Sequence, residues 1–187
     1  MGKLVYSMMV SLDGYIARPD GALDWVLIDE ELHAFANDQA RAEGAFLYGR
    51  RLYETMAAYW PTADADPSAH AVEIDFARIW RDKPKLVFSR TLDSVAWNSR
   101  LVREVSADEI RRLKAESDKN LSVGGADLAA SFVRLGLIDE YQPIVQPVIL
   151  GNGIPFLPRV DHALKLRLVE TRRFQSGVVF LRYQTDN

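Results

Sequence analysis

The chain has 187 residues, a length typical of a single domain spanning residues 1–187 with a sizeable core, and it contains no cysteine. Hydrophobic residues make up 48% and charged residues 26%, as in soluble globular proteins, and the formal net charge of -3 disfavours a broad nucleic-acid or anionic-membrane surface. The missing cysteines exclude disulfides, thiolate metal sites and cysteine nucleophiles.

The first segment of the chain has the pattern of a buried central strand. Residues 3–10 are apolar nearly throughout, as expected for a strand covered on both faces. The N-terminus carries one lysine and a brief apolar run broken by two serines and an aspartate, which does not fit a signal peptide. No apolar run approaches the length of a membrane span, and we expect a cytoplasmic protein.

Two turns and a helix are predicted next. Ser11-Leu12-Asp13-Gly14 is one turn, and Arg18-Pro19-Asp20-Gly21 is a second turn of the x-P-D-G form. A loop that carries Trp25 then leads to Asp29, which is placed to cap a helix extending to Arg41. The predicted buried face of this helix consists of Leu32, Phe35, Ala36 and Ala40.

The middle of the chain alternates strands and helices. The pattern predicts strands at 45–48, 85–88 and, more weakly, 101–105, and helices at 49–56, 72–80 and 107–116. Ser106 is expected to cap the last of these helices, with Glu109 as its capping-box partner. The composition of residues 61–71, rich in Pro, Asp, Ala and Ser, favours an irregular loop.

The C-terminal third begins with a strand, two glycines and a helix. Residues 121–123 are a short apolar run, Gly124-Gly125 follows, and the helical face after it ends near Gly136, the expected C-terminal cap. Residues 142–149 predict a strand whose two prolines lie at a bulge or an edge, and residues 164–184 predict a β-hairpin. The whole pattern predicts an α/β protein with three α/β/α layers and a mixed, mostly parallel central sheet closed by a C-terminal antiparallel hairpin.

Three junctions that follow predicted strands carry groups suited to phosphate. They are Tyr48-Gly49-Arg50-Arg51, Ser89-Arg90-Thr91 and Val123-Gly124-Gly125-Ala126. In a parallel sheet such junctions converge at one edge, where nucleotides bind. Glycines before a helix let an anion approach the backbone, and arginines with a hydroxyl suit a phosphate monoester such as the 2′-phosphate of NADP. The alternatives are a plain crossover turn at the glycines and solvated surface charges at the arginines.

These junctions and three other segments resemble a known family. The further segments are residues 11–17 (SLDGYIA), residues 137–141 (LIDEY) and residues 147–153 (PVILGNG). The chain resembles the dihydrofolate reductase fold and, more closely, the bacterial reductases grouped with the C-terminal reductase domain of the bifunctional riboflavin-biosynthesis deaminase-reductase. The resemblance implies an NADPH-dependent reductase that passes hydride to a small heterocycle of pteridine or pyrimidine type, and it implies a homodimer.

The resemblance also implies which residues bind NADPH. Gly49, Arg50 and Arg51 would reach the adenosine-side phosphates, and Ser89 and Arg90 would bind the 2′-phosphate. The residues implied for the pyrophosphate and the start of the following helix are Gly124, Gly125, Ala126, Asp127 and Leu128. Ile16 would lie against the nicotinamide ring.

The proton donor stays open. Dihydrofolate reductases carry a carboxylate early in the corresponding helix, and counting from Trp25 reaches Asp29 and Glu30, whereas counting back from Gly49 reaches His33. Asp29 has the ordinary alternative of helix cap, and His33 that of an exposed helix residue. The catalytic candidates are therefore Asp13, Asp29, Glu30 and His33.

Two positions depart from the family pattern. Leu52 stands where a threonine usually follows the glycine-arginine pair, which removes one hydroxyl from the phosphate site. Ser7 stands where the riboflavin enzymes place a lysine, four residues before the SLDG segment. The identity of the substrate therefore does not follow from the resemblance.

The expected partner is a small-molecule substrate, with neither nucleic acid nor membrane. The candidate substrate-binding residues are Asp13, Trp25, Tyr53 and Trp60. Asp13 has the alternative of bonding its own turn, Trp25 that of a loop anchor, and Trp60 that of core or dimer packing. The three histidines are scattered without ligand spacing, so no metal site is expected.

Two rival readings of the same residues remain. The first is a non-catalytic NADP(H)-binding or sensing domain that keeps the cofactor groove without turnover. The second has the junction arginines serve only a dimer interface, and it predicts that NADPH does not quench tryptophan fluorescence.

Overall fold

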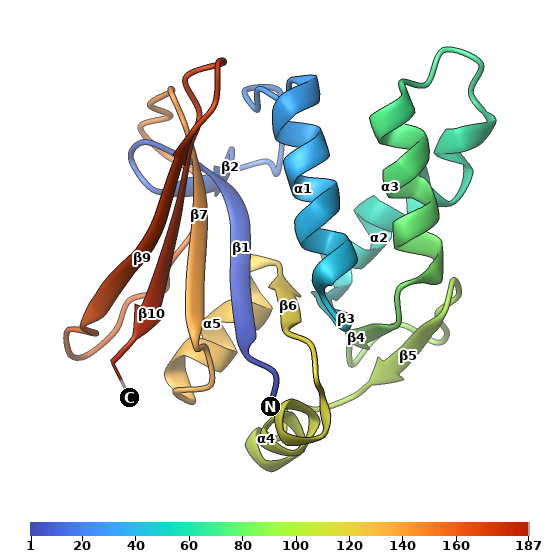
Figure 1. Cartoon of the computed structure of the whole chain (residues 1–187). Helices are drawn as coiled ribbons and strands as arrows, with labels where there is room; N and C mark the ends of the chain where they lie inside the picture. Colours follow the sequence, from blue (N-terminus) through green and yellow to red (C-terminus); the bar gives the residue numbers. More distant parts are fainter. Residues whose placement is uncertain (187) are drawn as a thin grey trace.

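The apolar N-terminal segment forms β1 (Leu4–Ser11), a strand in the interior of the sheet (Figure 1). The computed structural model describes residues 1–186. The other strands are β2 (Tyr15–Ala17), β3 (Ala45–Gly49), β4 (Lys85–Phe88), β5 (Ser99–Val102), β6 (Leu121–Gly124), β7 (Glu140–Gln146), β8 (Ile154–Pro155), β9 (Leu166–Arg173) and β10 (Val179–Thr185). The helices are α1 (Glu30–Ala42), α2 (Arg50–Tyr59), the 3-10 helix η1 (Trp60–Ala65), α3 (Ala71–Asp82), α4 (Ala107–Glu116) and α5 (Ala126–Arg134).

Eight strands form one sheet in the order β5-β4-β3-β6-β1-β7-β10-β9. Every neighbouring pair from β5 to β7 is parallel, whereas β10 runs antiparallel to both β7 and β9. The predicted C-terminal hairpin is therefore present as β9 and β10, and it closes one edge of the sheet. The predicted fold class, a mixed and mostly parallel α/β sheet, is confirmed.

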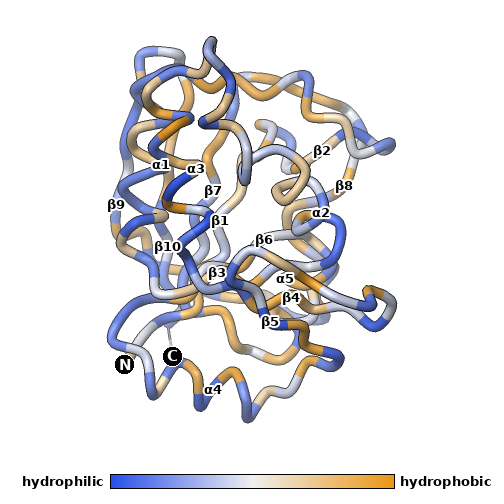
Figure 2. Tube along the Cα trace, turned by 90° about the vertical axis from the view of Figure 1, so that its right-hand side faces the viewer, coloured by the Kyte–Doolittle hydropathy of each residue, from blue (hydrophilic) through white to orange (hydrophobic). Residues whose placement is uncertain are grey.

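Helices cover both faces of this sheet because side chains of each strand alternate between the two faces. Leu47 of β3 and Tyr6 of β1 belong to an apolar cluster that α4 and α5 complete. Phe46 and Tyr48 of β3 belong to a second cluster with α1, α2 and α3. Figure 1 shows α1 and α5 on opposite sides of β1 and β6, and Figure 2 shows hydrophilic and hydrophobic turns alternating along α4.

Local signals set several helix ends. The Asp29 side chain accepts a 2.8 Å hydrogen bond from the Leu32 N–H, so the predicted cap of α1 is confirmed. The Ser106 hydroxyl accepts from the Glu109 N–H at 3.3 Å, and α4 covers the predicted residues. The Glu109 carboxylate pairs with Arg100 at 3.1 Å rather than completing a capping box.

Tertiary contacts explain the element that the sequence pattern missed. Residues 60–65 form a 3-10 helix, where an irregular loop was predicted from residue 61. Arg81 of α3 makes two hydrogen bonds of 2.6 and 2.7 Å to Asp64 and donates to the Pro61 carbonyl at 2.9 Å. Arg81, which lies 17 residues after Asp64, therefore orders this segment, and the local composition could not predict the contact.

The predicted strand at 101–105 begins and ends earlier, as β5, because its residues pair with β4 from Ser99 onward. Pro143 lies inside β7, which pairs with β10. The pairing of β10 with β9 shifts in register between Arg182 and Tyr183. The short ribbon of β2 with β8 was not predicted. Over residues 1–186, no helix has both the length and the apolar character that crossing a bilayer requires.

Candidate active site at the carboxyl edge of the sheet

The three phosphate-type junctions lie at one edge of the sheet. Strands β4, β3 and β6 are neighbours, with Gly49 opposite Phe88 and Tyr48 opposite Gly124. The residues that follow these positions therefore emerge side by side. A Cβ atom built on Gly125 would lie 3.9 Å from the Gly49 amide nitrogen, which places two of the junctions in contact distance.

Glycine occupies both positions of the junction between β6 and α5. Gly125 has a φ of +98°, a backbone conformation that is strained for any residue with a Cβ atom. A Cβ atom on Gly124 would lie 2.3 Å from Leu52 Cδ2, so Leu52 fills the space where a side chain would stand. Because Gly125, the N-cap residue, has no side chain, the first N–H groups of α5 are left for another acceptor.

Charged groups flank this helix start. Asp127, in the first turn of α5, is almost fully exposed, and its carboxylate lies 3.8 Å from Arg51 Nη1. A lone carboxylate there would repel an incoming phosphate, and Arg51 offsets that charge. The Leu128 side chain is buried in the apolar cluster that α4 and α5 complete. A Cβ atom built on Gly49 would lie 3.6 Å from it.

Arg50 connects the other two junctions. Arg50 donates to the Thr91 hydroxyl at 2.8 Å and to the Glu54 carboxylate at 2.9 Å, so it links α2 to the loop after β4. The buried Ser89 hydroxyl accepts from the Thr91 and Leu92 N–H groups and thereby shapes the loop, while Arg90 is exposed. This hydroxyl is therefore already engaged within the loop.

Sequence reasoning missed a further arginine here. Arg103 follows β5 and donates to the Ser89 and Leu92 carbonyls at 3.2 and 2.6 Å. The available signal was a cation directly after a strand, the same feature that drew attention to Arg90. The predicted strand extended to residue 105, whereas β5 ends at Val102, so the sequence pattern did not place Arg103 after a strand.

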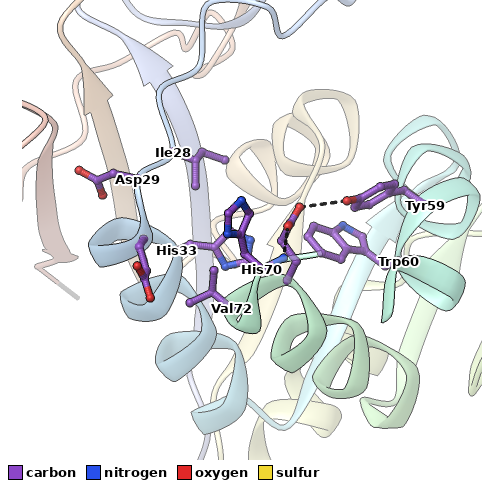
Figure 3. Close-up of a pocket in the computed structure, with 9 residues that line it drawn as sticks. Ile28, Asp29, His33, Tyr59, Trp60, His70 and Val72 are labelled. Carbon is purple, nitrogen blue, oxygen red and sulfur yellow. Dashed lines mark hydrogen bonds between the residues drawn. The ribbon is translucent and has the colours of Figure 1, made fainter. Parts of the chain in front are cut away.

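Two adjoining cavities lie beside this edge. One, of about 310 Å³, runs between α1 and the strands β1, β3 and β6, and has a mostly apolar lining. The other, of about 440 Å³, lies between the start of α1, η1 and the start of α3. Ile28, His33 and Trp60 line both cavities, so these residues stand where the two meet (Figure 3).

His33 occupies the boundary between the cavities. Its ring is edge-on to Trp60 and Phe76, with centroid distances of 6.0 and 6.1 Å. Its Nδ1 atom is buried and has no hydrogen-bond partner within residues 1–186. Burial lowers the pKa of His33 below its ordinary value, so the imidazole is neutral at pH 7. His33 therefore presents a neutral imidazole where the two cavities meet.

The carboxylate candidates have other partners or positions. The helix-capping bond from the Leu32 N–H lowers the pKa of Asp29 and holds it as an acceptor. Glu30 is exposed and lines only the outer cavity. Asp13 lines neither cavity; it accepts from the Ser11 hydroxyl at 2.7 Å and from the Leu150 and Gly151 N–H groups at 3.1 and 2.7 Å.

Asp13 therefore clamps the turn after β1 to the turn after β7. The Ser11 hydrogen bond is the main reason that the pKa of Asp13 is lowered. A carboxylate with a depressed folded-state pKa stabilises the fold above its ordinary pKa of about 3.9, and that contribution is lost as the pH falls through the folded value. We expect Asp13→Asn to lower Tm at neutral pH, with the difference from wild type vanishing in acid. Thermal unfolding across pH measures this, and a difference that does not change with pH would contradict it.

Two predicted substrate residues line neither cavity. Trp25 is 8% exposed and packs as a loop anchor, with its indole nitrogen buried and without a partner among residues 1–186. Tyr53 is buried, and its hydroxyl accepts from the Ala96 N–H at 2.8 Å. Tyr53 thus contacts the loop after β4, and the predicted substrate roles of both side chains stay predictions. Ile16 is likewise buried, within the α5 cluster, and Trp60 alone of the four substrate candidates lines the cavities.

No group of three or more histidine, aspartate or glutamate side chains within residues 1–186 is arranged to hold a metal ion. His33 and His70 both line the outer cavity, but His70 is exposed. The backbone N–H of His70 donates to the Glu73 carboxylate at 2.8 Å and caps α3. Figure 3 shows both histidines at this cavity with Tyr59 and Trp60 across from them.

Comparisons with known proteins agree with this architecture. Residues 2–180 match the family model described as the RibD C-terminal domain. The chain is 31% identical over 182 residues to the uncharacterized protein YyaP of Bacillus subtilis (strain 168), covering 97% of this chain and 94% of the relative.

Solved structures show the same fold at lower identity. A candidate riboflavin biosynthesis protein from Shewanella sp. PV-4 superimposes with a TM-score of 0.78 at 22% identity, covering 99% of both chains. Dihydrofolate reductase from Enterococcus faecalis, complexed with NADP(H) and RAB-propyl, superimposes with a TM-score of 0.65 at 13% identity, covering 99% of this chain and 97% of that one. The chain therefore belongs to the RibD C-terminal domain family and has a reductase-type fold like that of dihydrofolate reductase.

Proposed function

We propose that this protein is an NADPH-dependent reductase that transfers hydride to a small heterocycle of pteridine or pyrimidine type. One observation carries the proposal: a glycine-lined helix start and two arginine junctions share the sheet edge beside a cavity with a mostly apolar lining. Family membership supports a reductase, and the structural relative complexed with NADP(H) supports the choice of cofactor.

The residues present fit a phosphorylated dinucleotide. Gly125 has a positive φ that favours glycine, and the α5 N-terminus keeps N–H groups for an anion such as a pyrophosphate. In the proposed site, Gly124 to Leu128 hold the pyrophosphate with Asp127 neutralised by Arg51. Gly49, Arg50 and Arg51 reach the adenosine-side phosphates, and Ser89 and Arg90 the 2′-phosphate. When bound, the nicotinamide supplies hydride.

The chain's own residues would do the rest of the work. The apolar wall between α1 and the sheet excludes water from the reacting atoms, and Ile16 supports the nicotinamide end from within the α5 cluster. His33 is the one catalytic candidate on the wall that both cavities share, so its imidazole is the group proposed to hold or deliver a proton.

Two measurements test this function. NADPH is expected to quench tryptophan fluorescence, because Trp60 lies near the proposed site, and a panel of pteridines and pyrimidines is expected to include one that is reduced with loss of NADPH absorbance. Quenching without turnover by any panel member would favour the rival, a non-catalytic NADP(H)-binding or sensing domain. Absence of quenching would leave the junction arginines with an interface role only.

We also propose a homodimer that uses the sheet edge at β9. Exposed large apolar side chains gather on this strand and the segment before it, namely Ile149, Leu157, Val160, Leu164, Leu166 and Leu168. Leu166 and Leu168 are two residues apart and therefore project from the same face of β9. Exposed apolar residues concentrated on one edge strand are typical of an interface.

Leu168→Glu is expected to convert the dimer into a monomer, because it places a charge in the apolar contact. Leu135→Glu is the matched control: Leu135 is 42% exposed against 48% for Leu168, and it caps the end of α5 rather than lying on β9. Light scattering after gel filtration gives the mass of each variant. A wild-type monomer, or a Leu168→Glu dimer of unchanged stability, would contradict the proposed interface.

A further inference from the structure

The ionisable side chains that line the two cavities are all acidic, phenolic or imidazole groups. The carboxylates are Asp29, Glu30, Glu43 and Glu73, and the imidazoles are His33 and His70. Neither lining contains a lysine or an arginine from residues 1–186. An anion placed in either cavity would give up water without gaining a cationic partner, which is strongly unfavourable.

Three cations near the cavity-forming helices are engaged with acceptors, whereas Arg78 on α3 is exposed. Arg41 at the end of α1 bonds Asp75 of α3 at 2.7 Å, and Arg81 of α3 bonds Asp64 at 2.6 Å. Lys83 donates to the main-chain carbonyls of Arg41 and Glu43. Arg90 stands exposed at the sheet edge, and it lines neither cavity.

The closed end of the inner cavity is also unable to hold an anion. Glu43 lies there with Ser122, which hydrogen-bonds its carboxyl group, and with Tyr48. Burial raises the pKa of Glu43 to about 8, so this carboxyl group is largely protonated at neutral pH and becomes negative above it. At no pH does this end of the cavity offer a positive charge of its own.

The mouth of the outer cavity combines flat aromatic rings with acceptors. Tyr59 and Trp60 are edge-on at 4.9 Å, and the Tyr59 hydroxyl donates to Glu73 at 3.0 Å (Figure 3). Glu30 is exposed at the same mouth. Rings and carboxylates together favour a planar heterocycle that carries N–H or amino donors.

We infer that the substrate is a neutral or cationic heterocycle without a phosphate or carboxylate substituent. The inference rests on the proposed reductase function and narrows it, because it excludes phosphorylated pyrimidines and pteridines with carboxylate tails. A charged tail that extended from the cavity would still pass the carboxylates at its mouth. Ser7, which lines the inner cavity, adds a neutral hydroxyl and no cation.

Two matched pairs of probes test the inference on the full chain, both with and without saturating NADP⁺. They are pterin against pterin-6-carboxylate, and uridine against uridine 5′-monophosphate, with affinities measured by titration calorimetry. In at least one pair we expect the uncharged member to bind at least tenfold more tightly, a difference of about 1.4 kcal/mol. A preference below tenfold for the uncharged member in both pairs would overturn the inference, and so would the absence of binding by all four compounds.

A charge-reversal pair gives the matched control. Glu30→Lys puts a cation at the mouth and is expected to narrow the preference severalfold, whereas Glu116→Lys, on α4 across the sheet, is expected to leave it unchanged. An unaltered preference in Glu30→Lys would count against an electrostatic origin. A separate NADPH titration distinguishes the two proposals: without NADPH binding the reductase function fails, while a preference for uncharged probes would still uphold the cavity assignment.

Discussion

Replacing His33 by phenylalanine is expected to lower kcat for heterocycle reduction about a hundredfold or more, with NADPH affinity little changed. Proton transfer by a positioned side chain contributes factors of this size. Phenylalanine keeps the edge-on contacts with Trp60 and Phe76 and removes only the ring nitrogens, one of which is buried without a partner in residues 1–186. Stopped-flow absorbance of NADPH measures the rate, and tryptophan quenching measures the affinity.

The pH profile separates a proton donor from a packing residue. Burial lowers the pKa of His33 below about 6.5, so its protonated form accumulates only as the pH falls through and below that value. The wild-type rate is therefore expected to rise as the pH falls through this range, and the profile of His33→Phe is expected to be flat there. The same shift makes the folded state bind this proton less readily than the unfolded chain, so His33 also costs stability below about pH 6.5.

Asp29→Ser is the control for this experiment, because serine also caps helices and so preserves the start of α1. Its rate and pH profile are expected to stay close to wild type. A large loss of kcat in Asp29→Ser together with near-normal turnover in His33→Phe would move the catalytic assignment from the imidazole to the carboxylate.

The double replacement Arg50→Ala and Arg90→Ala is expected to abolish the preference for NADPH over NADH. Each charge-assisted hydrogen bond to a phosphate is worth on the order of 1.5–3 kcal/mol, so NADPH affinity should fall tenfold or more. NADH lacks the 2′-phosphate and should lose less, which makes the ratio of the two affinities the informative quantity. Fluorescence titrations at fixed ionic strength measure both.

Arg111→Ala serves as the charge-matched control, because Arg111 lies on α4 and pairs with Asp108 away from the junctions. It should leave both affinities unchanged. Since Arg50 also links Glu54 to Thr91, part of any loss could come from loosening that loop. An unchanged NADPH-to-NADH ratio in the double variant would contradict the assignment of these arginines to the 2′-phosphate.

Much of the fold could be predicted because its signals are local. The boundaries of α4 and the cap of α1 are set by serine, aspartate and helical periodicity, and the hairpin of β9 and β10 by alternation around a turn. The 3-10 helix at 60–65 could not be predicted, because Arg81 and Asp64 meet only in the folded chain. The β2 and β8 ribbon depends in the same way on residues more than a hundred positions apart.

The candidate site likewise has features that local sequence predicts and features that depend on tertiary packing. Glycines and arginines that follow strands could be recognised at their junctions, since a parallel sheet brings those ends together. Which catalytic candidate faces a cavity could not be recognised: Asp29 and His33 are one helical turn apart, and packing against Trp60 and Phe76 decides the matter. The family resemblance implied Trp25 beside the nicotinamide, but the sequence does not show that Trp25 and Tyr53 are both buried and line neither cavity.

A crystal structure of the protein soaked with NADP⁺ tests the central claim most directly. We expect the pyrophosphate at Gly124 and Gly125, the 2′-phosphate within hydrogen-bonding distance of Ser89, Arg90 or Arg50, and the nicotinamide opening onto the cavity that His33 lines. A dinucleotide bound elsewhere, or one whose phosphates touch only one of the three junctions, would contradict the account.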